Sequence, residues 1–268
     1  MSHSIQVAVH GAGGRMGQRV VALAVQDPNI EVVAAIEHDN HPALGQDAGL
    51  HAGVASLGVS LATDWPHSAS AVIDFSLPAA VDACVTASVA AKLPLVVATT
   101  GLDESQVDSL QSASRVIPIV WAPSMSTAVN VTMKLAQQAA AKLQSVAGGV
   151  DIEIIERHHR FKADAPSGTA LRFGELIAES LDANVGHVHG RDGETGARPR
   201  NEIGYHAVRV GDNPGEHTIV FGMMGETIEM KVAASNRDCY AAGALSAAKW
   251  LSGKSPGLYN MFDVLGMS

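Results

Sequence analysis

The chain has 268 residues, of which 47% are hydrophobic and 17% charged, and its formal net charge at pH 7 is −9. This length suffices for one large or two modest domains, each with its own buried core. The acidic balance argues against a nucleic-acid-binding protein, whose surface would be basic. No apolar run reaches the roughly 18 residues that span a bilayer.

Two further observations bear on location. The only cysteines, Cys84 and Cys239, each lie in an apolar helical pattern. This predicts neither a disulfide framework nor a metal knuckle and favours a reducing, cytoplasmic environment. The first predicted strand begins at Ile5, so we expect no targeting peptide before it.

The first half of the chain alternates short apolar runs with helical stretches. Strands are predicted at Ile5–Val9, Val32–Ile36, Ala71–Phe75, Leu95–Ala98 and Ile117–Trp121, and helices at Met16–Val25, Ala79–Ala91 and Glu104–Ala113. Short strands without polar alternation, separated by helices, are typical of a parallel sheet that is buried on both faces. We therefore predict an α/β fold with a Rossmann-type, doubly wound dinucleotide-binding domain at residues 1–126.

From about residue 126 the pattern changes. A long helix is predicted near residues 128–146, a strand at Val150–Glu156, a helix near Thr169–Leu181, a polar loop at Gly186–Arg200, and strands at Ile203–Val210, His217–Gly222 and Thr227–Ala234. Consecutive strands with tight turns indicate a mixed, largely antiparallel sheet. We predict an α+β domain for substrate binding and oligomerisation at residues 127–236. Residues 237–268, with a helix at Cys239–Leu251, should complete the first domain.

Two strands of the second domain carry apolar side chains on both faces, at Ile219–Phe221 and Ile228–Val232. A helix can cover only one face of such a sheet. Either a loop folds over the other face, or that face packs against another copy of the chain in a homo-oligomer.

A glycine-rich motif directly follows the first strand and opens the first helix; we call residues 11–17 the glycine turn. It reads Gly11, Ala12, Gly13, Gly14, Arg15, Met16 and Gly17. Glycines allow a tight turn and bring backbone N–H groups against a pyrophosphate at the helix N-terminus. The spacing is G-x-x-G-x-x-G, because Met16 occupies the third position of the usual fingerprint. Glu37, at the end of the second strand, is expected to accept hydrogen bonds from an adenosine ribose; otherwise it is a surface residue beside a structural turn.

Other residues near the predicted strand ends allow two interpretations. Arg15 either lies over the pyrophosphate or caps the solvent side of the helix, and His38 is either a surface residue or a weak contact for a 2′-phosphate. Loops in which open α/β sheets bind ligands follow the fourth and fifth strands. They contain Ala98, Thr99 and Thr100, and Ala122, Pro123, Ser124 and Met125. Their small hydroxyl side chains suit a nicotinamide ribose and carboxamide, although such loops are often only turns.

The most unusual stretch is residues 158–170, which we call the histidine–lysine segment. It places His158, His159, Arg160 and Lys162 just before a Pro-Ser-Gly-Thr turn that opens a helix. A cationic pocket beside helix amides holds anions, and histidine moves protons near neutral pH. Because neighbouring side chains of a strand alternate, the two histidines should point apart and differ in role. No suitably spaced cysteine or carboxylate joins them, so metal binding is not predicted.

The residues after Pro166 resemble a helix start, with Ser167 or Thr169 as the cap. The free amides there, together with the Thr169 hydroxyl and the Lys162 ammonium, could bind carboxylates. In an acidic protein, such a local positive field favours a dianionic small molecule.

Taken together, these motifs resemble the dihydrodipicolinate reductase (4-hydroxy-tetrahydrodipicolinate reductase) family of lysine biosynthesis. The resemblance rests on the glycine turn, Ala98–Gly101, Asp151–Glu156, the histidine–lysine segment, Gly215–Thr218 and the tail from Trp250 to Leu265, and so covers essentially the whole chain. It implies NADH- or NADPH-dependent reduction of a cyclic imine dicarboxylate to tetrahydrodipicolinate, usually by a homotetramer built through the second domain's sheets.

The resemblance also implies residue roles. His158 matches the proton donor and Lys162 its partner in catalysis. His159, Ser167, Gly168 and Thr169 match the substrate-binding segment, and the glycine turn, Glu37 and the two strand-end loops match the cofactor site. Hydride transfer to the conjugated ring carbon leaves an enamine, which a neighbouring acid must protonate. Lys162 would stabilise charge and position a carboxylate.

The sequence departs from the commoner family pattern in three places. Ala98 replaces a frequent glycine, residues 123–125 replace an Asn-Phe type of loop, and His38 replaces an arginine beside the ribose-binding glutamate. Because neutral histidine holds a 2′-phosphate less firmly than arginine, we expect use of both cofactors, with NADH at least comparable to NADPH.

Three alternatives explain less of the sequence. Another two-domain dehydrogenase for an amino-acid-derived aldehyde or a sugar would account for the glycine turn but not for the histidine–lysine segment. A nucleotide sensor should carry a basic or appended module, and a methyltransferase would leave the cationic pocket idle.

Overall fold

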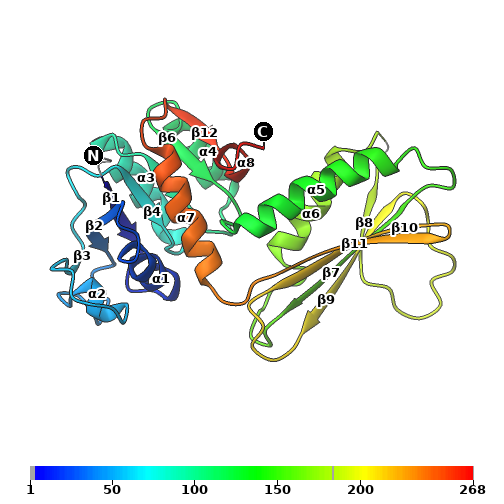
Figure 1. Ribbon diagram of the computed structural model, residues 1–268, viewed down its shortest axis with the longest axis horizontal. Coiled ribbons are helices and arrows are strands. Elements are labelled where there is room, and N and C mark those ends of the chain that lie inside the picture. Colours follow the sequence, from blue (N-terminus) through cyan, green and yellow to red (C-terminus); the bar gives the residue numbers. More distant parts are fainter. Residues whose placement is uncertain (1–3, 183, 268) are drawn as a thin grey trace. The chain divides into compact units, whose positions relative to one another are not determined.

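A computed structural model describes residues 4–182 and 184–267 (Figure 1). The chain divides into two compact units, one formed by the residues up to Thr127 together with those from Arg237 onward, the other by Ala128–Asn236. None of the helices in these described ranges is long and apolar enough to cross a membrane.

The first unit contains a seven-stranded sheet with the order β12-β6-β5-β4-β1-β2-β3, in which every pairing is parallel. Its strands are β1 (Ile5–His10), β2 (Ile30–Ile36), β3 (Leu61–Ala62), β4 (Ala71–Asp74), β5 (Leu95–Val97), β6 (Pro118–Trp121) and β12 (Gly257–Tyr259). The strand order reverses between β1 and β4, the position at which open α/β sheets bind ligands.

Helices cover both faces of this sheet. They are α1 (Arg15–Ala24), α2 (Ala48–His51), α3 (Pro78–Ala91), α4 (Glu104–Ala113), α7 (Asp238–Leu251) and α8 (Met261–Val264). Val7 and Val9 of β1 belong to a core with α1 and α7, whereas Ala8 belongs to a core with α3 and α4. This alternation confirms the doubly wound prediction. In the C-terminal tail, β12 pairs with β6 of the same sheet.

The second unit contains a five-stranded sheet with the order β11-β10-β7-β9-β8 and two helices. The elements are α5 (Thr127–Leu143), β7 (Asp151–His158), α6 (Gly168–Glu179), β8 (Gly186–His189), β9 (Glu202–Arg209), β10 (Glu216–Met223) and β11 (Glu226–Ala233). Figure 1 shows α5 and α6 on the same side of this sheet. The buried side chains of β7 and β10, such as Ile154 and Phe221, alternate with more exposed ones, so one face forms the core.

Two details of this sheet differ from the sequence prediction. Residues 186–189 form β8 rather than loop. In addition, β9 and β10 do not form a hairpin: β7 lies between them, antiparallel to β10 and parallel to β9. Two pairings are antiparallel and two parallel, so the sheet is evenly mixed rather than largely antiparallel. Sequence order alone suggests a hairpin because it cannot show that the 210–215 connection crosses the end of β7.

The face of this sheet opposite to its core is partly covered. Arg191 and Arg198, from the loop after β8, bind the carboxylate of Glu153 on this face, with the shortest N–O distance 2.8 Å in each pair. Ile155 and Val208, further along the same face, are 41% and 42% exposed. A loop therefore lies over one end of the face, and apolar side chains remain accessible at the other.

Candidate active site

The glycine turn connects β1 to α1 with little room for side chains. Gly11 has φ +74°, and a Cβ there would lie 2.8 Å from the carbonyl oxygen of Phe75. A Cβ on Gly17 would lie 2.1 Å from the carbonyl oxygen of Gly11, so α1 can approach the turn only without a side chain. Gly14 caps α1 without any side-chain hydrogen bond. The first amides of α1 are thus left for a ligand or water.

Glu37 is tied directly to this turn. Its Oε2 accepts a hydrogen bond from the Gly13 amide at 2.9 Å, and its Oε1 accepts one from the His38 amide at 3.0 Å. The Glu37 side chain is 11% exposed, whereas that of His38 is 61% exposed. Arg15 is also exposed, at the first position of α1. The carboxylate is therefore fixed beside the glycine amides, and the two basic side chains extend to solvent.

A buried aspartate joins the last residue of β1 to the loops that follow β4 and β5. Asp74, at the end of β4, accepts hydrogen bonds from Thr99 Oγ1 at 2.6 Å and from the Ser76 amide at 3.2 Å, and it contacts His10 Nδ1 at 2.7 Å. Thr99 is therefore engaged inside the protein, while Thr100 is exposed. His10 and Asp74 also lie near the Cys84 thiol, but these hydrogen bonds already account for the Asp74 carboxylate.

The loop after β6 is largely part of the core. Ala122, Ser124 and Met125 are buried and Pro123 is exposed. A Cβ on Gly243 of α7 would lie only 1.7 Å from the Met125 carbonyl oxygen, which shows how closely α7 passes. This loop therefore offers a ligand mainly backbone groups. The same holds for Ala98 in the loop after β5, which is half-buried and donates its amide hydrogen to the Asp74 carbonyl oxygen.

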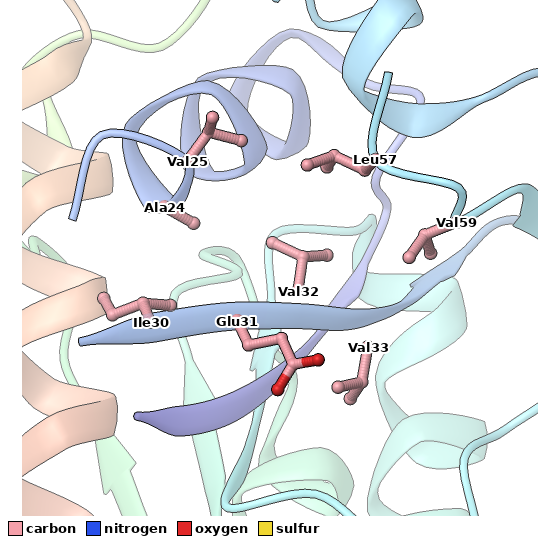
Figure 2. A pocket seen from close by; sticks show the side chains of 8 residues that line it. All are labelled: Ala24, Val25, Ile30, Glu31, Val32, Val33, Leu57 and Val59. Carbon is pink, nitrogen blue, oxygen red and sulfur yellow. The ribbon is translucent and has the colours of Figure 1, made fainter. Parts of the chain in front are cut away.

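A separate pocket lies at the C-terminal end of α1 and contains none of the predicted site residues. It is lined by Ala24, Val25, Ile30, Glu31, Val32, Val33, Leu57 and Val59 (Figure 2). Glu31 is its only titratable side chain, and the Gln6 side-chain amide donates to that carboxylate. Apart from Glu31, the side chains that line it are aliphatic, so the pocket contains no cationic side chain for an anion and no second titratable group.

In the second unit, β7 brings the first residues of the histidine–lysine segment together. His158 is the last residue of β7 and is buried, and His159 follows it outside the strand. The His158 Nδ1 atom lies 2.5 Å from Glu156 Oε2, a contact that strand geometry favours because residues two apart share a face. The His159 amide donates to the Asn213 carbonyl, and its Nδ1 is buried with no hydrogen-bond partner among the described residues. The two rings thus have different surroundings, as alternation predicts.

Lys162 and the start of α6 lie close to His158 in sequence and carry the remaining polar groups. Lys162 Nζ forms an ion pair with Asp164 Oδ1 at 2.8 Å. Ser167 is the cap of α6, since its side chain accepts a hydrogen bond from the Ala170 amide. Gly168 is exposed and Thr169 is half-buried, so the first turn of α6 is accessible.

Two further side chains, the half-buried Arg209 and the buried His217, complete the surroundings of His158. Arg209 of β9 binds both oxygens of Glu156, at 2.8 and 2.6 Å. His217 of β10 lies 3.1 Å from Ser167 Oγ through its Nε2, and its ring meets that of His158 edge to face at a centroid distance of 5.2 Å. Burial and the neighbouring His158 lower the pKa of His217 to about 4, so this imidazole is neutral at physiological pH.

The pKa of His158 itself is lowered from its ordinary value, mainly by burial. Glu156 acts against this shift, whereas the cations Lys162 and Arg209 add to it. Burial would also raise the pKa of Glu156, but hydrogen bonds from Arg209 and His158 hold it below its ordinary value. The pKa of His158 is therefore set by one carboxylate that raises it and by burial and two cations that lower it.

Comparison with known proteins decides the family. Models of the N-terminal and C-terminal parts of dihydrodipicolinate reductase match residues 5–125 and 128–265.

The chain belongs to the dihydrodipicolinate reductase family.

Individual members of this family align with it over nearly its full length. A 4-hydroxy-tetrahydrodipicolinate reductase of Rhodopirellula baltica is 64% identical over 98% of this chain and 97% of its own. One from Alkalilimnicola ehrlichii is 43% identical over 98% and 99%. The structure of a dipicolinate-bound dihydrodipicolinate reductase from Paenisporosarcina sp. TG-14 superposes with a TM-score of 0.76 at 26% identity, covering 97% of this chain and 98% of that one. An amine dehydrogenase of Mycobacterium smegmatis shares the fold alone, with a TM-score of 0.64 at 11% identity.

Sequence reasoning assigned no role to several polar residues of these two sites. They are His10 and Asp74 in the first unit, and Glu156, Arg209 and His217 in the second. Arg209 and His217 contact residues 53 and 50 positions away in the chain, and Asp74 and His10 are 64 positions apart. The available signal was a charged or polar residue within an otherwise apolar predicted strand, since such a residue needs a partner when it is buried.

Proposed function

We propose that this protein is a 4-hydroxy-tetrahydrodipicolinate reductase, which reduces a cyclic imine dicarboxylate to tetrahydrodipicolinate with NADH or NADPH in the diaminopimelate route to lysine. The observation that carries this proposal is the position of His158. It is a buried imidazole whose neighbours in the chain are a lysine and an accessible helix N-terminus. These are a proton donor and an anion site in a chain whose two halves both match the family.

The residues of the first unit fit a nicotinamide dinucleotide. The uncapped start of α1 offers amides to a pyrophosphate, and the Glu37 carboxylate lies beside them at the end of β2, where a ribose is bound in this fold. When bound, the cofactor supplies the hydride. Arg15 and His38 are exposed near the same turn and would contact the phosphates. Because Thr99 is bonded to Asp74, the loop after β5 would bind through its backbone and Thr100.

The residues of the second unit would bind the dicarboxylate and protonate it. Ser167 caps the Ala170 amide. The two preceding amides of α6, those of Gly168 and Thr169, would hold a carboxylate together with the Thr169 hydroxyl and His159. Lys162 would neutralise charge on the same anion. Loss of the 4-hydroxyl group as water makes the ring a conjugated imine. Hydride addition to its conjugated ring carbon then leaves an enamine, and the His158 imidazolium donates its Nε2 proton to the adjacent carbon. His158 is then neutral and takes up a proton from solvent.

The direct test is an absorbance assay. The purified protein is mixed with the product of dihydrodipicolinate synthase and with NADH or NADPH, and oxidation of the nicotinamide is followed. We expect oxidation that requires all three components. If neither cofactor is oxidised, the enzyme assignment is wrong.

The role of Lys162 can be tested separately. Lys162→Ala removes the cation that would stabilise charge on the substrate, so kcat/KM for the substrate should fall by about 10²-fold while NADH binding is unchanged. Lys231→Ala is the matched control, because Lys231 is also a lysine in an ion pair but is 58% exposed, on the β11 strand. Equal activity of the two variants would contradict the role.

We also propose a cytoplasmic homotetramer. The partly uncovered sheet face, with Ile155 and Val208 exposed, supports association through the second unit. Light scattering after size exclusion should give four times the monomer mass of 27.8 kDa. Ile155→Lys should yield smaller species, and a wild-type monomer would refute the proposal.

A further inference from the structure

Glu156 has no role in the mechanism above, yet its carboxylate is buried and both of its oxygens are hydrogen-bonded. It is 1% exposed, and its oxygens accept hydrogen bonds from both terminal nitrogens of Arg209 and from the Ser167 amide at 3.0 Å, in addition to the His158 contact. A buried carboxylate is costly unless it is paired and hydrogen-bonded. This arrangement meets that condition fully.

The sheet register explains why these groups meet. Glu156 and His158 are two residues apart on β7 and share its buried face, and His158 is the direct neighbour of Arg209 on β9. Ser167 precedes α6 and reaches Glu156 through its backbone amide. One carboxylate therefore connects the imidazole, the strand beside it and the start of the helix proposed to bind substrate.

We propose that Glu156 is a positioning residue: it accepts the Nδ1 proton of His158, so that the proton for the substrate is carried on Nε2, and it stabilises the imidazolium form. Arg209 keeps the Glu156 carboxylate ionised, so that Glu156 does not take the proton from the imidazolium. The hydrogen bond to the Ser167 amide holds the N-terminus of α6 in register with His158. This inference rests on the proposed function, in which His158 is the acid.

The charged groups around His158 make the proposal testable through pH. Glu156 on β7 raises the pKa of His158, while Lys162 on the following loop and Arg209 on β9 lower it; His217 on β10 faces it as a neutral ring. Protonated His158 is the active acid, so activity should fall as pH rises through its pKa. Removing Glu156 must lower that pKa, and removing Arg209 must raise it.

Two substitutions that break the same ion pair should therefore have opposite effects. In Glu156→Gln, the falling limb of the kcat–pH profile should move to lower pH, and kcat at pH 7.5 should drop by about tenfold to a hundredfold, within the contribution of a general acid. In Arg209→Gln, the same limb should move to higher pH. A purely structural ion pair would weaken activity in both variants without moving the limb, and that result would overturn the proposal.

The matched control is Glu153→Gln. Glu153 lies on the same strand and also binds arginines, but on the opposite face. Glu153→Gln should leave the falling limb of the kcat–pH profile at its wild-type pH. Glu156→Asp replaces Glu156→Gln as the test if the latter does not fold. Its shorter carboxylate should still give a kcat that falls as pH rises, as in the wild type, but kcat itself should be lower.

The NMR titration of the ¹⁵N-labelled His158 ring separates this inference from the proposed function, because it needs no substrate. In the free wild-type protein we expect the neutral ring to carry its proton on Nδ1, and the titration midpoint to shift down in Glu156→Gln and up in Arg209→Gln. A neutral ring protonated on Nε2 in the wild type would overturn the inference even if the reductase activity is confirmed.

Discussion

The glycine turn and the histidine–lysine segment both follow the end of a strand and lead into the start of a helix, yet they are built from different atoms. In the glycine turn the backbone would bind the ligand, since neighbouring carbonyl oxygens exclude side chains at Gly11 and Gly17. In the histidine–lysine segment the ionisable side chains of His158 and Lys162 would act on the substrate, and Glu156 raises the pKa of His158. The first site should therefore be sensitive to volume and the second to charge and pH.

The largest expected effect comes from the acid itself. His158→Gln keeps the shape of the side chain but removes the transferable proton, so kcat should fall by about 10²–10⁴-fold. NADH affinity, measured by fluorescence titration, should stay at the wild-type value because the glycine turn is unchanged. His206→Gln is the control, since His206 is also bound to a glutamate, Glu153, but lies on the other face of the sheet. Normal turnover in His158→Gln would refute its role.

Added volume should affect folding and cofactor binding at the first site, but only substrate binding at the second. Gly17→Ala places a Cβ against backbone at 2.1 Å, so it should cost about 1–3 kcal/mol of stability and strongly weaken NADH binding. Gly168→Ala has no atom within 4 Å of the new Cβ; it should fold normally, bind NADH normally and raise only the KM for the dicarboxylate. Thermal unfolding and NADH titration of both variants check this. Equal melting temperatures would remove the proposed contrast.

Stability should depend on pH through the second site. His217 is buried neutral, with its pKa lowered from 6.5 to about 4. The unfolded chain takes up this proton more readily, so the contribution is fully present above pH 6.5 and is lost as pH falls towards 4, about 3 kcal/mol in all at about 1.4 kcal/mol per unit. Urea unfolding at fixed protein concentration should show this loss, and His217→Gln should flatten it. If the unfolding free energy of His217→Gln fell with decreasing pH as steeply as that of the wild type, the assignment of this pH dependence to His217 would be wrong.

The smallest effect concerns the choice of cofactor. His38 is 61% exposed beside Glu37, so an arginine there would reach a 2′-phosphate in a largely solvated pair. His38→Arg should raise kcat/KM for NADPH by about threefold to fivefold and leave that for NADH unchanged. In the wild type, kcat/KM for NADH should be at least comparable to that for NADPH. A kcat/KM that favours NADPH a hundredfold would contradict this expectation.

Much of the fold could be predicted from periodicity because its strands are short, apolar and separated by helices. Five of the seven strands of the first sheet and the helix at 104–113 lie where the sequence places them, whereas the short strands β3 and β12 were not predicted. Residues 186–189 were missed because three of the four residues of β8 are exposed, and its sequence has no apolar pattern. The position of β7 between β9 and β10 could not be predicted, since strand order depends on pairing across the sheet and not on the order along the chain.

The candidate sites divide in the same way. The glycine turn and the histidine–lysine segment are continuous in sequence, so their motifs were visible, and the alternate surroundings of His158 and His159 follow from strand geometry. The supporting residues were not visible because their partners are distant in the chain. Thr99 shows the consequence: as a hydroxyl in a strand-end loop it suggested a ligand contact, but its hydrogen bond goes to the buried Asp74.

The most direct test of the central claim follows the hydride itself. The protein is incubated with the synthase product and NADH that carries deuterium at both C4 positions of the nicotinamide, and the reduced dicarboxylate is analysed by mass spectrometry. We expect a product one mass unit heavier than that formed with unlabelled NADH. An unlabelled product, or no reduced product with either NADH or NADPH, would contradict it.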